Sequence, residues 1–173
     1  ALVGYILFNS NAQLMITIIS ATNRLQSNTK LVAKEYQRLL AEKGVEAGLM
    51  ALDELDICRR NELFTLMEEK YLIPAKKFII VMPEYNGSFP GILKLMIDLS
   101  GIEKAWWHKK VLLTGVSTGR AGNLRGMEHL TGSLLHMKML VHPNRLPIST
   151  VHTLMDEKKH FNNEQTLAAI NTQ

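Results

Sequence analysis

Short apolar runs alternate with segments of helical periodicity along most of the chain. The apolar runs predict strands at residues 16–19, 45–52, 78–82, 111–116 and 139–141, the last of which resumes near residues 148–151. Apolar residues three or four apart predict helices at residues 29–43, 61–71, 91–99 and 124–137. Asn162 with Gln165 is typical of a capping box that begins a last helix. Strands that alternate with helices indicate a doubly wound α/β fold, with helices on both faces of a parallel sheet.

The same periodicity indicates which side of each helix packs inward. The predicted inward residues, in chain order, are Val32, Tyr36, Leu39, Leu40, Leu63, Leu66, Met67, Tyr71, Ile92, Leu93, Met96, Ile97, Met127, Leu130, Leu134 and Met137. Core packing explains the methionines among them without a cofactor role.

The composition is that of an ordinary globular protein, with 46% hydrophobic and 21% charged residues. A chain of 173 residues suits one domain with a sizeable core, which we place at residues 15–173. Met15 stands directly before the first predicted strand, so we expect residues 1–14 to be an N-terminal extension that is not native. No apolar stretch reaches the length of roughly 18 residues that a membrane span needs, so we expect no membrane partner.

Charge and cysteine content narrow the functional classes. The net charge of +4 weakly favours anionic ligands such as phosphorylated cofactors. The basic residues are scattered and form no nucleic-acid motif, so we expect no nucleic-acid partner. Cys58 is the only cysteine, which excludes an internal disulfide and favours a reducing compartment, here the cytoplasm. No neighbour activates its thiol, so we expect a small buried or half-buried side chain.

Three polar loops each follow a predicted strand and precede a predicted helix, which places them along one edge of a parallel sheet. The first, residues 20–29, reads SATNRLQSNT. The helix that it opens offers free N–H groups and a favourable dipole to a phosphate. Ser27, Asn28 and Thr29 can donate to that phosphate, and Arg24 can neutralise it. Helix capping by Ser27 or Asn28 in an ordinary polar loop is the alternative.

The second and third loops are equally polar. Residues 83–91 read PEYNGSFPG, where Asn86 and Gly87 predict a turn and Pro90 suits the first turn of a helix. Exposed N–H groups beside Tyr85 can hold a flat heteroaromatic ring by its polar edge. Residues 117–126 read STGRAGNLRG, where three glycines allow a close backbone approach and Arg120 adds positive charge. Ordinary turns explain the second and third loops about as well as ligand binding does when each is considered alone, but the three loops together favour a ligand site.

The three loops resemble those of the NADPH-dependent FMN reductase family, a flavodoxin-like group that includes quinone, chromate and azo-dye reductases. The resemblance runs from about Met15 to the end and is most specific over residues 83–98. It implies contacts with the FMN phosphate from Thr22, Arg24, Ser27, Asn28 and Thr29. It implies contacts with the isoalloxazine edge and ribityl chain from Pro83, Glu84, Tyr85, Asn86 and Gly87, and a third flavin loop that contains Ser117, Thr118, Gly119 and Arg120. The sequence departs from the family pattern at Ala21, Thr22, Thr29 and Arg120.

The resemblance also implies a fold and an activity. The fold is a five-stranded parallel sheet in the order 2-1-3-4-5, with FMN at the switch point between strands 1 and 3. The activity is hydride transfer from NADPH or NADH to flavin N5, and then to a quinone, azo, nitro, metal or free-flavin acceptor. The flavin does this chemistry, so no catalytic side chain is predicted. Arg24 or Arg120 can contact the phosphates of the nicotinamide dinucleotide.

Family members commonly form homodimers or homotetramers. Trp106 and Trp107 can contribute to such an interface or pack within the subunit. Two other functions remain open at this point. One is an FMN-binding electron carrier of flavodoxin type, although such carriers tend to be acidic. The other is a regulatory relative that has lost the flavin.

Overall fold

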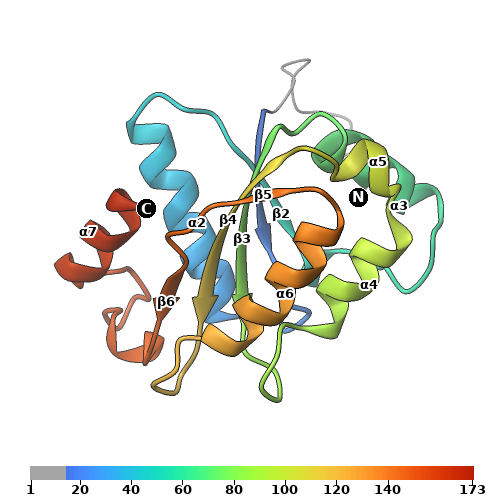
Figure 1. The fold of residues 1–173 in the computed structure, drawn as a ribbon. Helices are drawn as coiled ribbons and strands as arrows, with labels where there is room; N and C mark the ends of the chain where they lie inside the picture. The colour runs from blue at the N-terminus through green and yellow to red at the C-terminus, as the bar shows by residue number, and fades with distance from the viewer. Residues whose placement is uncertain (1–14) are drawn as a thin grey trace.

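The computed structural model describes residues 15–173, and these form a parallel sheet with the strand order β2-β1-β3-β4-β5. The strands are β1 (Ile16–Ser20), β2 (Gly48–Ala51), β3 (Lys77–Pro83), β4 (Lys110–Val116) and β5 (Leu140–Val141). A further strand, β6 (Leu146–Ile148), also pairs in parallel with β4, beyond β5 on the same edge (Figure 1). The predicted fold class and strand order are therefore confirmed. The prediction for residues 1–14 lies outside the described residues.

Helices cover both faces of this sheet (Figure 1). One face carries α2 (Asn28–Glu42) and α7 (Glu164–Thr172). The other carries α3 (Glu62–Met67), α4 (Gly91–Leu99), α5 (Ile102–Ala105) and α6 (Leu124–His136). Three short segments complete the fold: η1 (Leu52–Glu54), the π-helical turn η2 (Glu68–Leu72) that continues α3, and η3 (Val151–Thr153). None of the helices in residues 15–173 is long and apolar enough to cross a membrane.

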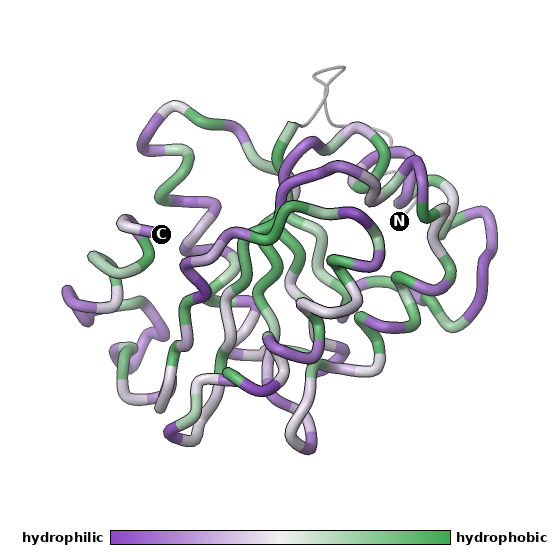
Figure 2. Tube along the Cα trace, viewed as in Figure 1, coloured by the Kyte–Doolittle hydropathy of each residue, from purple (hydrophilic) through white to green (hydrophobic). Residues whose placement is uncertain are grey.

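The core consists of two hydrophobic clusters, one on each face of the sheet, because successive strand residues point to opposite faces. Ile18 belongs to the cluster under α2 and α7, and Ile19 to the cluster under α3, α4 and α6. Figure 2 shows the central strands as an apolar layer between more polar helices. Trp106 lies fully buried against Phe78, with ring centroids 5.1 Å apart, and donates its indole N–H to Ser100. Trp106 therefore packs within the subunit.

Several predicted helix faces are confirmed. In α6 and directly after it, all of the predicted inward residues are buried. In α2 and α4 most are buried, while Leu40 and Ile92 are partly exposed. The face predicted for the second helix is only partly confirmed, because Met67 is buried as predicted, whereas Leu63 and Leu66 are partly exposed and Phe64 is buried instead.

Other predictions are wrong in detail. The second strand begins at Gly48, and Val45 is exposed. The last strand resumes at β6, whereas Val151 begins η3. The last helix is capped by Asn163 rather than Asn162, and the hydroxyl of Thr166 donates to the same side-chain oxygen that accepts from the Thr166 N–H, so the predicted capping box is wrong. Cys58 is exposed, because it lies on the surface loop between η1 and α3.

Candidate flavin site

All three polar loops line one cavity of about 550 Å³ beyond the carboxyl ends of β1, β3 and β4. Figure 1 shows these loops together below the arrowheads of the strands. The predicted site residues that line the cavity are Arg24, Ser27, Asn28, Thr29, Pro83, Glu84, Tyr85, Asn86, Gly87, Ser117, Thr118, Gly119 and Arg120. Thr22 is the exception, because its side chain is fully buried. Parallel topology thus brings together residues that lie far apart in the sequence.

One end of the cavity is formed by the start of α2. The side chain of Ser27 accepts a hydrogen bond from the N–H of Lys30 and caps the helix. The first N–H groups of a helix have no acceptor within it, so those of Asn28 and Thr29 can bind an anion. The ammonium of Lys30 lies 2.9 Å from Asp53 and 2.5 Å from Glu54. Lys30 is therefore already paired with two carboxylates, and Arg24 is a further cation that lines the cavity.

Ala21 occupies a position where the family has glycine. It does not adopt a positive φ, and its N–H donates to the carbonyl of Val81 over 2.9 Å. The side chain is fully buried. Alanine therefore fits this turn without backbone strain, and the departure from the family pattern does not distort the loop.

The other end of the cavity is formed by the loop after β3. Tyr85 and Ser88 exchange backbone hydrogen bonds of 2.9 and 3.1 Å, and Asn86 and Gly87 between them have φ values of 51° and 77°. Two positive φ values are the mark of a type I′ turn, so the predicted turn is confirmed. The hydrogen bonds of the turn leave out the N–H groups of its two central residues. These N–H groups can donate to a ring edge.

Tyr85 is held firmly within this loop. Its hydroxyl lies 2.5 Å from Oγ1 of Thr22, and the guanidinium carbon of Arg24 lies 4.3 Å from the centre of its ring. The first loop therefore contacts Tyr85 on its hydroxyl and on its face. The Arg24 contact has the geometry of a cation–π interaction.

The third loop is stabilised by hydrogen bonds within the loop and by hydrogen bonds from the segment around residue 150. The hydroxyl of Ser117 donates to the carbonyl of Gly119 and accepts from the N–H of Gly122. The N–H groups of Thr150 and Val151 donate to the carbonyls of Gly119 and Ser117. The segment around residue 150, which the sequence analysis placed in a strand, therefore supports this loop, and Val151 lines the cavity.

The sequence analysis missed Asn123. Its side-chain amide is buried and donates to the carbonyls of Met82 and Pro83, over 3.1 and 2.8 Å. It thereby joins the end of β3 to the start of α6. Asn123 adopts a positive φ of 60°, which asparagine tolerates better than most residues. An asparagine directly before a predicted helix was the only available signal. Sequence reasoning also missed the cavity-lining residues Leu25, Gln26, Val116 and Ala121.

The comparisons with known proteins bear on this arrangement. Residues 14–153 match the family model of NADPH-dependent FMN reductases. The chain belongs to this family. The predicted family is therefore confirmed, and the predicted activity and cofactors agree with its description. A 2-hydroxy-1,4-benzoquinone reductase from a Burkholderia species is 29% identical over 76 residues, a match that spans 42% of this chain and 42% of that protein.

Solved structures support the fold of this FMN reductase family member. An oxidoreductase from Corynebacterium diphtheriae matches with a TM-score of 0.68 at 14% identity, over 93% of both chains. The flavoenzyme NAD(P)H:(acceptor) oxidoreductase from Paracoccus denitrificans matches with a TM-score of 0.67 at 20% identity, over 93% of this chain and 92% of that one. At these identities the likeness shows the fold.

The residues of the cavity fit FMN. The free N–H groups of the first α2 turn, with Arg24, suit a phosphate at one end. The open turn of Asn86 and Gly87 suits the polar edge of a ring at the other end. Within residues 15–173, no group of three or more histidine, cysteine, aspartate or glutamate side chains could hold a metal ion.

Proposed function

We propose that the protein is an FMN-dependent oxidoreductase that takes a hydride from NADPH or NADH and passes it to a small-molecule acceptor. The observation that carries this proposal is the meeting of three loops, from β1, β3 and β4, in one cavity. The start of α2 supplies donors for a phosphate, and the turn after β3 supplies donors for the edge of a ring. Membership of the NADPH-dependent FMN reductase family supports the same conclusion.

The start of α2 holds the phosphate. Asn28 and Thr29 donate their backbone N–H groups, Ser27 keeps the first turn capped, and Arg24 supplies a positive charge. The third loop, with Ser117, Thr118 and Gly119, lies against the middle of the ligand. A side chain at Gly119 would meet no atom within 4 Å, so the backbone there is open to close approach.

The turn after β3 binds and tunes the ring. The N–H groups of Asn86 and Gly87 donate to its polar edge and stabilise negative charge there, since N–H dipoles favour an anion. FMN, when bound, supplies reversible acceptance and release of a hydride. Arg24 or Arg120 binds the phosphates of the nicotinamide dinucleotide, because both line the cavity. The match to a benzoquinone reductase favours a quinone as the acceptor.

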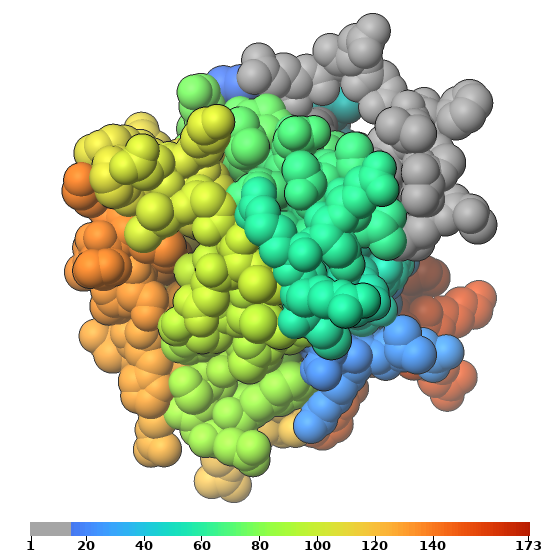
Figure 3. Space-filling model, turned by 90° about the vertical axis from the view of Figure 1, so that its right-hand side faces the viewer, coloured from blue at the N-terminus to red at the C-terminus, as the bar shows by residue number. Residues whose placement is uncertain are grey.

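We also propose a homodimer or homotetramer in a reducing compartment such as the cytoplasm. Three large apolar side chains, Ile102, Leu124 and Leu135, are 40 to 58% exposed on α5 and α6. Figure 3 views the side of the molecule that α4 and α5 build, with α6 beside them. Their exposure supports an interface that covers α5 and α6.

The test combines a titration with a turnover assay. FMN fluorescence is titrated with the wild-type protein and with Arg24→Ala, and NADPH oxidation is then followed with 1,4-benzoquinone. Loss of a charge-assisted contact weakens FMN binding by about tenfold or more. Lys34→Ala is the matched control, because it removes one exposed positive charge from α2 away from the cavity. We expect it to bind FMN as the wild type does.

Each other outcome favours a different function. A wild-type protein that does not bind FMN would contradict the proposal and favour the regulatory relative. A protein that binds FMN without steady NADPH oxidation would favour the electron carrier. The net charge of +4 argues against the carrier.

A further inference from the structure

Thr22 differs from the other residues that the family pattern assigns to the phosphate. Its side chain has no exposed surface. Its N–H donates to the carbonyl of Ser20, and its hydroxyl oxygen accepts from the N–H of Arg24 over 3.1 Å. The same oxygen shares a hydrogen bond of 2.5 Å with the hydroxyl of Tyr85. The N–H and the hydroxyl of Thr22 are therefore committed within the protein.

The partner of this hydroxyl, Tyr85, lies at the ring end of the cavity. Its backbone is fixed by the two hydrogen bonds with Ser88, and the face of its ring by Arg24. The remaining freedom is rotation of the ring and tilt of the hydroxyl. Thr22 restrains both, because threonine is stiff at χ1 and its hydroxyl is buried at a fixed position.

We propose that Thr22 is a positioning residue, whose buried hydroxyl holds Tyr85 in place at the ring end of the cavity and does not contact the FMN phosphate. This inference rests on the proposed function, because Tyr85 matters only if the cavity binds a flavin. It gives Thr22 and Ser27, two hydroxyl residues of one loop, different roles. Ser27 lines the cavity at the phosphate end, whereas Thr22 lies beneath its surface.

Riboflavin, which has the ring but not the phosphate, separates the two possible roles. Thr22→Val keeps the shape of the side chain and removes the hydroxyl. A positioning role predicts that this variant weakens the binding of FMN and of riboflavin by the same factor, about fivefold for one hydrogen bond. Thr22→Ser restores the hydroxyl and binds both flavins within about twofold of the wild type. The visible spectrum of the bound flavin shifts in Thr22→Val and not in Thr22→Ser.

A double-mutant cycle identifies the group through which Thr22 acts. Tyr85→Phe removes the partner hydroxyl, so Thr22→Val weakens flavin binding less in that background than in the wild type, and any remaining effect comes from the lost acceptor of the Arg24 N–H. A loss confined to FMN, with riboflavin binding unchanged, would overturn the proposal in favour of a phosphate contact. Effects of Thr22→Val and Tyr85→Phe that simply multiply would also overturn it, because Thr22 would then act independently of Tyr85. If Thr22→Val does not fold, the double-mutant cycle is made with Thr22→Ala in its place, which also removes the hydroxyl.

A flavin-free measurement keeps this inference distinct from the proposed function. In protein with isotope-labelled tyrosine, the NMR signals of the Tyr85 ring move in Thr22→Val and stay in place in Thr22→Ser. Unchanged signals in Thr22→Val would overturn the positioning role while leaving FMN binding by the wild type intact. A wild type that binds neither flavin would overturn the proposed function, and with it the flavin part of this inference, even if the NMR signals move.

Discussion

Asn123 shows how much of the site depends on a single side chain. Its amide donates to the carbonyls of Met82 and Pro83 at the end of β3, and its backbone adopts a positive φ. In Asn123→Ala both carbonyls lose this donor, and alanine must adopt a left-handed conformation. We expect a loss of about 2–4 kcal/mol in the free energy of unfolding, from the unpaired carbonyls and the strained backbone together. Urea unfolding followed by circular dichroism measures it.

Asn123→Gly is the matched variant, because it removes the same amide but tolerates the positive φ. We expect it to be more stable than Asn123→Ala by about 1 kcal/mol. Equal stabilities would show that the backbone conformation costs nothing at this position. A wild-type-like stability of both variants would contradict the role of the amide.

At the scale of elements, the sequence predicts the buried face of a helix best where one hydrophobic period persists along the whole helix. Every predicted inward position of α6 is buried, since a long helix against a sheet repeats the same contact on each turn. The start of β2 is less predictable. The N–H groups of Gly44 and Val45 donate to the carbonyls of Ala41 and Leu40, and Gly44 has a positive φ. This helix-ending motif uses Val45, an apolar residue that pattern alone assigns to the strand.

Part of the face predicted for the second helix was wrong for a different reason. The predicted helix consists of α3, which ends at Met67, and the π-turn η2, so one period of 3.6 residues does not hold over its whole length. Glu68 lies on the inward side, where its carboxylate accepts from Arg60 and from the N–H of Gly101. Hydrophobic periodicity cannot predict a buried carboxylate, because its partners come from elsewhere in the chain.

The candidate site was predictable in its outline. Strand-to-helix loops of a parallel sheet meet at one edge, so the three polar loops follow from topology. The roles of Thr22 and Asn123 were not predictable, because their partners lie about 40 to 60 residues away, at Met82, Pro83 and Tyr85. Such contacts depend on the exact register of neighbouring loops.

A buried lysine at the other end of the sheet makes the stability of η2 depend on pH. Lys109 donates to the carbonyls of Leu72 and Ile73, over 2.7 and 2.9 Å. Burial, together with the nearby charge of Lys76, lowers the pKa of Lys109 from 10.5 to about 8. Between these values the unfolded chain binds more protons than the folded protein, so this lysine makes stability rise with pH.

Lys109→Met removes this dependence. We expect the melting temperature of the wild type, relative to that of Lys109→Met, to rise between pH 7.5 and pH 10 and to stay constant below that window. Thermal unfolding at several pH values measures it. Lys110→Met, at an exposed neighbouring position, is the control for loss of one charge. A relative melting temperature that falls with rising pH would contradict the lowered pKa.

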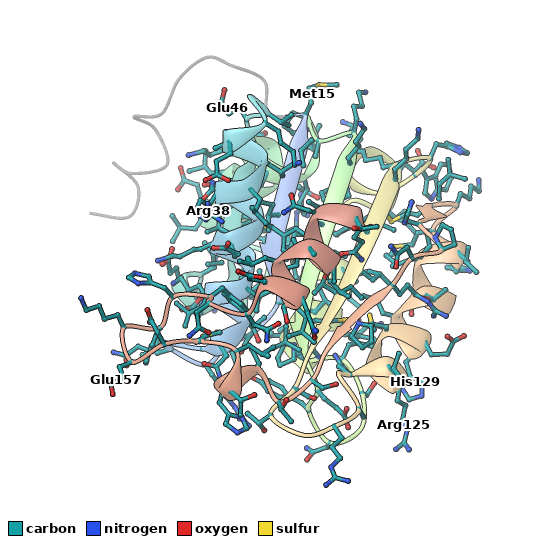
Figure 4. All side chains as sticks on the ribbon, turned by 90° about the vertical axis from the view of Figure 1, so that its left-hand side faces the viewer. Met15, Arg38, Glu46, Arg125, His129 and Glu157 are labelled. Carbon is teal, nitrogen blue, oxygen red and sulfur yellow. The ribbon has the colours of Figure 1, made fainter. Side chains whose placement is uncertain are left out.

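At the scale of the whole molecule, the cavity and the buried lysine lie at opposite ends of the sheet. Figure 4 shows Met15 and Glu46 at one end of the sheet, with Arg125 and His129 at the other, beside the cavity loops. Lys109 and η2 belong to the end where β4 begins, and the cavity lies where it finishes. A seven-residue strand spans roughly 20 Å, so changes at one end leave the other largely undisturbed.

Flavin binding should nevertheless stabilise the whole domain, because the three loops extend from strands that carry both hydrophobic clusters. A ligand that bridges these loops binds only the folded protein. At a concentration 100 times its dissociation constant it contributes about 2.7 kcal/mol. For a domain of this size, that corresponds to a rise of about 5–10 °C in the melting temperature. Differential scanning calorimetry with and without FMN measures the rise.

The size of this rise in melting temperature also tests which part of the flavin each end of the cavity binds. Riboflavin at the same concentration should stabilise less, because it cannot bind the N–H groups of Asn28 and Thr29. Arg24→Ala should reduce the rise with FMN more than the rise with riboflavin, because the arginine charge acts mainly on the phosphate. Equal rises in melting temperature with the two flavins would mean that the start of α2 does not bind the phosphate. The ring end, with Tyr85 and the turn after β3, would then carry the binding alone.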